Sequence, residues 1–324
     1  MSRRVFMLVI AFLITFVADF SAPPWAHTKD LKVAMILWRG ETQAEKGFRD
    51  GLKAFGYSVQ YTVMNAGQDR TELGRLMREE LKPQLDGFDY VYLFGTTVAL
   101  AAKSIVTEKT PQIYNAVADP VGAGIVQSAE SPGGNITGVT NEIPLALQIQ
   151  TALEVISFKR LGLLFNPREK NSMLVREKFT DVAKKFRFEV VDLRSPPAQE
   201  MLQENLEKLR NKSVAVDAVY LPPDSFLVSA AKLIGSELAA AKIKSIASLE
   251  TYIEKGALMG VVPDYLELGR IAASIVHRHE LGTKLPQIPV QSAKQPQLMI
   301  NKSTTKALNV KIPEAMLKKA VMVE

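Results

Sequence analysis

The sequence predicts an α/β protein made of two lobes, each a doubly wound parallel sheet. The chain has 324 residues, and at about 100 to 200 residues per domain this length favours two lobes. Past residue 30, short β-branched or aromatic runs alternate with helical patterns. A break in composition at residues 131–135 (Ser-Pro-Gly-Gly-Asn) separates a first series of such units from a second. Parallel sheets covered by helices on both faces are expected from this alternation.

The strands are predicted from apolar runs that end in turns. They are Lys32–Leu37, Ser58–Val63, Tyr90–Phe94, Gln112–Ala116, Arg160–Phe165, Phe188–Leu193, Ala218–Leu221, Lys244–Ala247 and Ala257–Val262. Between them, apolar stripes at helical spacing predict helices such as Gln43–Phe55 and Tyr265–Leu281. A Pro-rich extended stretch, 286–296, then leads to Leu298–Asn301 and to a final Ala- and Lys-rich helix. The chain is therefore expected to return between the lobes.

Charge and cysteine content exclude several classes of protein. The 40 Lys and Arg exceed the 34 Asp and Glu by 6, but the basic residues alternate with acidic ones, and the longest basic runs are pairs. A mildly basic, solvated surface is expected rather than a nucleic-acid-binding face. There is no Cys, which excludes disulfides, Cys-ligated metals, thiol nucleophiles and a lipid-modified N-terminal Cys.

The N-terminus has the composition of an export signal. Basic residues at Arg3 and Arg4 precede the apolar stretch Val5–Val17, which is too short for a bilayer that needs about 20 apolar residues. Residues 1–26 are predicted to be a cleaved signal peptide, and the mature chain a soluble periplasmic protein, not a lipoprotein. A membrane anchor is the alternative. The cleavage position and the choice between the general secretory and twin-arginine routes stay open.

Polar side chains recur where the predicted strands end, which is where open α/β sheets bind ligands. They are Trp38, Thr96, Thr97, Asp119, Asn166, Asp224, Asp264 and Tyr265. Groups that both donate and accept hydrogen bonds suit a small polar or zwitterionic ligand, with Asp119 or Asp264 binding an ammonium group. Trp38 and Tyr265 are expected either to stack on a planar ligand or to pack in the core, and the Asp and Thr residues also qualify as helix caps. Arg39 is either a site residue or a surface partner of Glu41.

No constellation typical of an enzyme is found, so no enzyme, cofactor or metal is expected. His277 and His279 lie two residues apart, on different faces of a helix, and are predicted to be surface residues. The sequence has no Gly-x-Ser-x-Gly elbow, no complete glycine-rich dinucleotide motif and no Walker phosphate loop.

The segment from Ala118–Gly124 through Pro132–Val139 resembles the signature of one family of substrate-binding proteins of ABC importers, the tryptophan/tyrosine type. Further blocks agree in order: Leu164–Pro167, Tyr220–Asp224, Gly256–Leu258, Asp264–Gly269 and Ile300–Asn301. The resemblance implies a type I periplasmic-binding-protein fold with a three-linker hinge. Lobe 1 would comprise residues 27–140 and 264–292, and lobe 2 residues 141–263 and 293–324.

The resemblance also implies a function and a site. A monomeric receptor would bind a small polar or amino-acid-like ligand, such as an aromatic amino acid, between its lobes and deliver it to a membrane permease with its ATPase. Asn141, Asn171 and Ser172 join the strand-end residues as candidates for the cleft. The loop after the first strand, 38–42, departs from the pattern of many relatives, so the ligand's identity stays open. A periplasmic sensor that signals through a partner protein is the alternative function.

Overall fold

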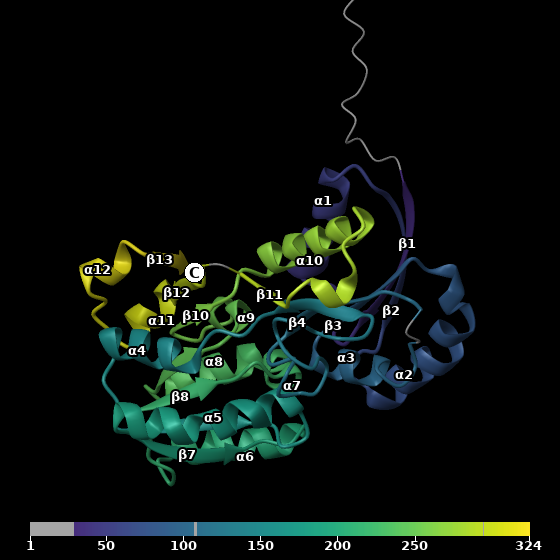
Figure 1. Ribbon diagram of the computed structural model, residues 1–324. Helices are drawn as coiled ribbons and strands as arrows, with labels where there is room; N and C mark the ends of the chain where they lie inside the picture. The colour runs from purple at the N-terminus through teal and green to yellow at the C-terminus, as the bar shows by residue number, and fades with distance from the viewer. Residues whose placement is uncertain (1–28, 107–108, 294) are drawn as a thin grey trace, which may run out of the picture.

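Two α/β lobes lie side by side in the computed structural model, which describes residues 29–106, 109–293 and 295–324 (Figure 1). One lobe is built around a six-stranded sheet and the other around a seven-stranded sheet. The predicted signal peptide, residues 1–26, lies outside the described residues. Within the described ranges, no helix combines the length and apolarity that a membrane crossing requires.

The six-stranded sheet is parallel throughout, with the order β11-β5-β4-β3-β1-β2. Its strands are β1 Asp30–Leu37, β2 Ser58–Asn65, β3 Tyr90–Phe94, β4 Gln112–Val117, β5 Ile136–Thr140 and β11 Gln291–Ser292. The helices around it are α1 Gln43–Ala54, α2 Arg70–Arg75, α3 Thr96–Ala102 and α10 Tyr265–Glu280, with a π-helix at Leu76–Leu81 and 3₁₀ turns at Lys82–Gly87 and Leu285–Gln287.

Helices α1 and α10 cover one face of this sheet, and α2 and α3 cover the other (Figure 1). The α1–α10 crossing is close because both helices present glycine. A Cβ on Gly47 would lie 2.1 Å from the backbone oxygen of Leu266, and one on Gly269 would lie 2.0 Å from that of Ala44. Helix α10 is thereby fixed to the first lobe, although it follows a strand of the second.

The seven-stranded sheet has the order β13-β12-β10-β9-β8-β6-β7 and is parallel except where β12 pairs antiparallel with β10. Its strands are β6 Arg160–Phe165, β7 Glu189–Arg194, β8 Ala218–Leu221, β9 Lys244–Ala247, β10 Met259–Val262, β12 Gln297–Asn301 and β13 Ala320–Val323. Its helices are α4 Leu145–Val155, α5 Lys170–Phe186, α6 Gln199–Arg210, α7 Ser225–Ser229, α8 Ala231–Ala240, α9 Glu250–Glu254, α11 Lys302–Ala307 and α12 Glu314–Leu317.

The chain passes between the two sheets three times: from β5 to α4, from β10 to α10, and from β11 to β12. The predicted fold class, two lobes with mainly parallel sheets, is confirmed, and all nine predicted strands are present. Strand β12 covers the expected stretch Leu298–Asn301, whereas β5, β11 and β13 were not predicted. The expected final helix is instead two short helices followed by β13, which pairs with β12.

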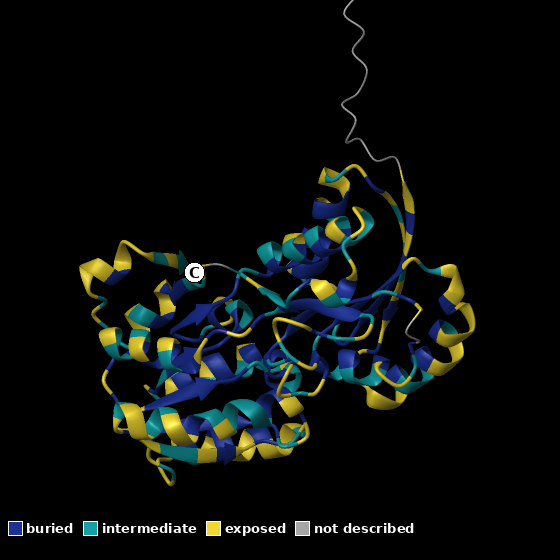
Figure 2. Ribbon diagram, in the orientation of Figure 1, coloured by how far each residue is buried: buried dark blue, intermediate teal, exposed yellow. Residues whose placement is uncertain are grey.

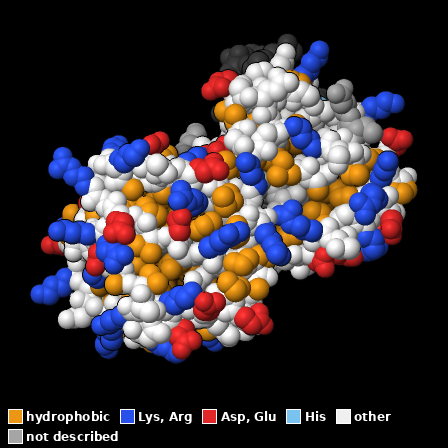
Figure 3. Space-filling view, turned by 90° about the horizontal axis from the view of Figure 1, so that it is seen from below, with side chains coloured by type: hydrophobic (Ala, Val, Ile, Leu, Met, Phe, Trp, Pro, Cys, Tyr) orange, Lys and Arg blue, Asp and Glu red, His pale blue; other side chains and the backbone are white. Residues whose placement is uncertain are grey.

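The central strands of each sheet are buried, whereas the edge strands β2, β7 and β13 and the outer sides of the helices carry exposed residues (Figure 2). Strands β3 and β4 are buried along their whole length, as expected for sheets covered on both faces. On the face shown in Figure 3, basic and acidic side chains are interspersed over both lobes.

The prediction that both α10 histidines are surface residues needs correction. The His277 ring stacks on Phe55 with ring centroids 4.1 Å apart, and its Nδ1 lies 2.9 Å from the Tyr57 hydroxyl. The Nδ1 of His279 lies 2.6 Å from the Tyr90 hydroxyl. Both side chains are partly buried because the last turn of α10 packs against aromatic residues of the first lobe.

Candidate ligand-binding site

Two adjoining cavities lie between the lobes. The first, which we call the charged compartment, is lined by Trp38, Arg39, Phe94–Thr97, Ala116, Ala118, Asn141, Glu169, Asn171, Pro223–Ser225, Leu249 and Tyr265. The second, which we call the apolar compartment, is lined by Ala118, Asp119, Asn141–Ile143, Leu145, Gln148, Asn171, Leu174, Val175, Lys178, Tyr220, Pro223 and Ser248. The two share Ala118, Asn141, Asn171 and Pro223, and we refer to both together as the cleft.

Most of the residues proposed from the sequence meet at this cleft. The charged compartment contains Trp38, Thr96, Thr97, Asn141, Asn171, Asp224 and Tyr265, and the apolar compartment contains Asp119. They come from strand ends of both sheets, which is why the strand-end rule brought them together.

Asn166, Ser172 and Asp264 line neither compartment. The Asn166 backbone N–H donates to Ser172 Oγ over 2.9 Å, and Asn166 Oδ1 accepts from the backbone N–H of Arg168, so these side chains hold the turn before α5. Asp264 caps α10: its Oδ1 accepts from the backbone N–H of Glu267 at 3.0 Å. The geometry therefore gives these residues local structural roles.

The first-lobe wall of the charged compartment carries a cation and aromatic rings. The Arg39 guanidinium lies over the Phe94 ring, 5.6 Å from its centroid. Glu41 pairs with Arg49 at 2.6 Å, so the alternative of an Arg39–Glu41 pair is corrected. Within the described residues no carboxylate lies within 4 Å of Arg39. The Tyr265 hydroxyl accepts from Asn141 Nδ2 at 3.1 Å, which fixes its ring beside the cleft.

The second-lobe wall carries two buried carboxylates. Glu169, 6% exposed, accepts hydrogen bonds from the backbone N–H and the hydroxyl of Ser225 and from Asn171 Nδ2. Asp224, 2% exposed, caps α7 by accepting from the backbone N–H of Leu227 at 2.9 Å. No described Lys or Arg forms an ion pair with either acid.

The two carboxylates perturb each other's ionisation. Burial raises the pKa of Glu169. Burial and, after it, the neighbouring charge of Glu169 raise the pKa of Asp224 well above its ordinary value. Like charges in a desolvated place repel each other and favour protonation, and a positively charged group placed beside them would relieve the same repulsion.

Unpartnered polar atoms concentrate at the cleft. Seven buried side-chain nitrogen or oxygen atoms in the described part of the chain lack a hydrogen-bond partner. Four belong to residues of the charged compartment: Trp38 Nε1, Asn141 Oδ1, Asn171 Oδ1 and Asp224 Oδ2. Because buried polar groups in proteins are nearly always paired, this concentration indicates a place that binds a polar molecule.

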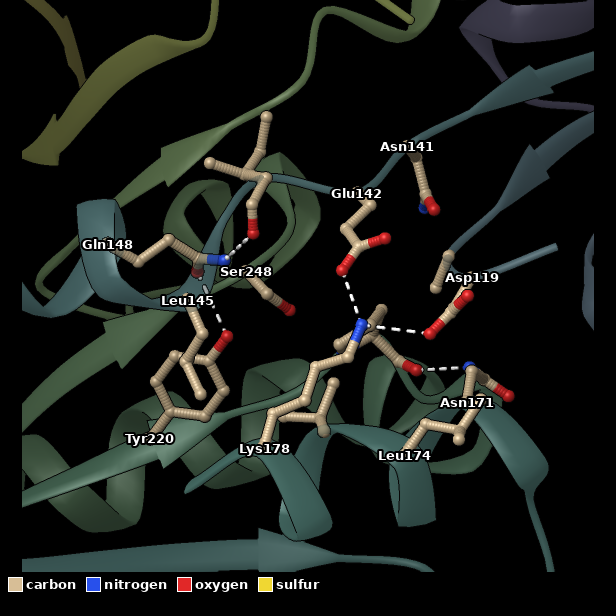
Figure 4. A pocket seen from close by; sticks show the side chains of 14 residues that line it. Asp119, Asn141, Glu142, Leu145, Gln148, Asn171, Leu174, Lys178, Tyr220 and Ser248 are labelled. Atoms are coloured by element: carbon tan, nitrogen blue, oxygen red, sulfur yellow. Dashed lines mark hydrogen bonds and ion pairs between the residues drawn. The ribbon is translucent and has the colours of Figure 1, made fainter. Parts of the chain in front are cut away.

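A lysine bridges the lobes across the apolar compartment (Figure 4). Lys178 Nζ of α5 donates to Asp119 Oδ2 at 2.9 Å and to Glu142 Oε1 at 2.5 Å. Although burial opposes it, the hydrogen bond from Lys178 lowers the pKa of Asp119. Asp119 is thus already paired with a cation, which weakens its predicted role as the ammonium partner.

Several cleft residues escaped the sequence-based prediction. Glu169 follows the end of β6 by four residues, so a wider reading of the strand-end rule finds it. Arg39 was weighed and left open. Gln148 and Lys178 lie within helices α4 and α5, where no turn or strand end marks them.

The sequence model of the family described as "ABC transporter substrate binding protein" matches residues 33–324. The chain belongs to this family. The predicted family and the main predicted function, an ABC-transporter substrate-binding protein, are confirmed. Proteins of this family bind solutes outside the cytoplasm.

Relatives share both sequence and fold. The chain is 31% identical over 277 residues to a "Tyrosine-binding protein" of Clostridioides difficile strain R20291, covering 83% of this chain and 77% of the relative. A conserved domain protein of Vibrio cholerae has a TM-score of 0.82 at 27% identity, covering 91% of this chain and all of that one. An ABC domain from Streptococcus pneumoniae in complex with L-Trp has a TM-score of 0.79 at 27% identity, covering 90% and 100%.

Proposed function

We propose that this chain binds an amino-acid-like zwitterion in the interlobe cleft and delivers it to the permease and ATPase of an ABC importer. One observation carries the proposal: the buried pair Glu169 and Asp224 lines the same compartment as Arg39, a cation that forms no ion pair with any described carboxylate. An ammonium group would bind the carboxylates and a carboxylate would bind the guanidinium, through charge-assisted hydrogen bonds.

An aromatic amino acid is the ligand class we favour. The relatives are described with tyrosine and with L-Trp, and Trp38 and Tyr265 offer rings on which a planar group would stack. The hydroxyls of Thr96 and Thr97, at the start of α3, would donate to the ligand carboxylate. Asn141 and Asn171 would contact the ligand where the two compartments join.

Closure of the lobes is part of the proposal. The hinge would join residues 27–140 and 264–292 to residues 141–263 and 293–324. Three separate chain crossings support it, because several connectors at one place allow rotation of the lobes without their separation.

We propose that the protein works as a monomer in the periplasm after removal of residues 1–26. The short apolar segment and the absence of Cys support a cleaved signal peptide rather than a lipid anchor. N-terminal sequencing of the exported protein should find a start near residues 23–27. An intact Met1 in the membrane fraction would contradict this.

Native mass spectrometry of the freshly purified protein tests the ligand class, because a tightly bound ligand is carried through purification. We expect an adduct with the mass of one amino acid, and calorimetric titration of the ligand-stripped protein with L-tyrosine and L-tryptophan should show a single site. Failure of all the proteinogenic amino acids to bind would refute the proposal.

A further inference from the structure

The cleft continues beyond the charged groups into the apolar compartment. In Figure 4, Asn141, Asn171 and Asp119 lie at one end of this compartment, and Gln148 and Tyr220 lie at the other. The first end is shared with the charged compartment. If the charged groups of a ligand bind to Glu169, Asp224 and Arg39, its remaining atoms would have room to extend past the shared residues toward Gln148.

The apolar compartment has aliphatic side chains along its walls and polar side chains at its far end. Ile143, just before α4, and Leu145 of α4 line it together with Leu174 and Val175 of α5. At the far end the lining becomes polar but carries no charge: Gln148, Tyr220 and Ser248. Lys178, Asp119 and Glu142 also line the compartment, but their charges are paired with one another. The compartment thus matches an uncharged side chain that is mainly apolar along its length.

The Gln148 side chain uses only part of its hydrogen-bonding capacity within the described residues. The side chain, 5% exposed, donates from Nε2 to the Ile143 carbonyl oxygen at 2.9 Å and accepts from the Tyr220 hydroxyl at its Oε1, also at 2.9 Å. A carboxamide has two N–H donors and an oxygen with two acceptor sites. Among the residues that the structure describes, no group pairs with the second N–H donor or with the second acceptor site.

We propose that the apolar compartment holds the ligand's side chain and selects one that carries a neutral polar atom at its tip, with Gln148 as the specificity-determining residue. This rests on the proposed function. The phenol of tyrosine and the indole of tryptophan meet the requirement, whereas phenylalanine does not. A site built to pair a polar atom discriminates against the analogue that lacks it, since its own polar group is then buried unpaired.

Two matched ligand pairs test the inference by calorimetry. L-Tyrosine and L-phenylalanine differ in one hydroxyl, and L-tryptophan and L-benzothienylalanine differ in the indole N–H. For the wild type we expect at least one pair to differ by about tenfold or more in Kd, corresponding to about 1.4 kcal/mol. Gln148→Met keeps the length of the side chain and should reduce this ratio to about threefold or less. Gln150→Met, at an exposed position on the same helix, is the control and should keep the wild-type ratio.

If the two Kd values in each ligand pair lie within about threefold of each other for the wild type, the inference is overturned, even if the variant fails to fold. The inference would also be overturned if a Gln148→Met protein that melts cooperatively keeps the wild-type ratio of Kd values within a ligand pair. The same result in Gln148→Asn, whose side chain is one methylene shorter, would overturn it as well. The proposed function fails separately, if no amino acid binds at all.

Discussion

Asp224→Asn separates the two roles of the buried acid pair. The substitution keeps the side-chain shape and the cap on α7, where Asp224 Oδ1 accepts from the backbone N–H of Leu227 at 2.9 Å. Asn caps a helix about as well as Asp. What it removes is the ability of one of two neighbouring carboxyls in a desolvated site to carry a negative charge, so affinity and stability should change in opposite directions.

The expected loss of affinity follows from the ligand contact that disappears. A hydrogen bond to a charged group contributes about 1.5 to 3 kcal/mol, so the Kd for the confirmed ligand should rise about 10- to 140-fold. The stability of the ligand-free protein should rise instead. The folded pKa of Asp224 is raised above its unfolded value, so its contribution to stability is fully present below the unfolded pKa and is lost as the pH rises through the folded value. The Asn variant does not lose stability in this way, so the difference in the free energy of unfolding between the variant and wild type should grow from pH 5 to pH 8.

Asp264→Asn is the matched control. Asp264 also caps a helix, with its Oδ1 3.0 Å from the backbone nitrogen of Glu267, but it lines neither compartment. The affinity of the Asp264→Asn variant for the ligand should stay within about twofold of wild type. Calorimetric titration and thermal melting at both pH values measure the two effects on the same samples.

The reasoning would be refuted by an Asp224→Asn protein that binds the ligand within about twofold of wild type. An equal loss of affinity in Asp264→Asn would also refute it, because the loss would then come from the cap and not from the contact with the ligand.

Two further substitutions test the charges around the cleft. Lys178→Met should remove the ion pairs that join α5 to Asp119 and Glu142. Partly exposed ion pairs contribute about 0.2 to 1 kcal/mol, so calorimetry should show that the Kd for the ligand rises by up to about fivefold. If this difference in Kd persists in 1 M salt, the bridge is not ionic. Burial and, after it, the charge of Glu254 raise the pKa of Glu250 to about 7, so its contribution to stability is lost as the pH rises from the ordinary range of a carboxyl through 7. The melting temperature of wild type should accordingly fall more between pH 5 and pH 8 than that of Glu250→Gln, and parallel curves would disprove the shift.

The sequence predicted the fold because parallel strands covered on both faces are nearly continuous apolar runs. Strands β3 and β4 are buried along their whole length, and both were predicted. Strand β5 escaped because Thr and Gly interrupt its apolar residues. Strand β13 directly follows the pair Lys318 and Lys319 and pairs only with β12, at the edge of its sheet. Pairing between such distant segments leaves no local pattern.

The sequence predicted where the site lies better than what each residue does there. Asp224 and Asp264 both follow a strand and both cap the next helix, so the local sequence cannot tell which carboxylate also lines the cleft. Only the arrangement of the lobes distinguishes them. Gln148 and Lys178 reach the cleft from the sides of helices, and no rule about strand ends identifies such residues.

The division of charge between the lobes explains why a zwitterion fits this cleft better than a simple amine or a simple acid. Glu169 and Asp224 belong to segments of the second lobe, whereas Arg39 follows β1 of the first. A simple amine would neutralise only the second-lobe wall, and a simple carboxylate only the first. A molecule that carries both charges neutralises both walls at once and, because its groups are covalently joined, stabilises the lobes against each other. Under the proposed function, ligand charge and lobe closure would thereby be coupled.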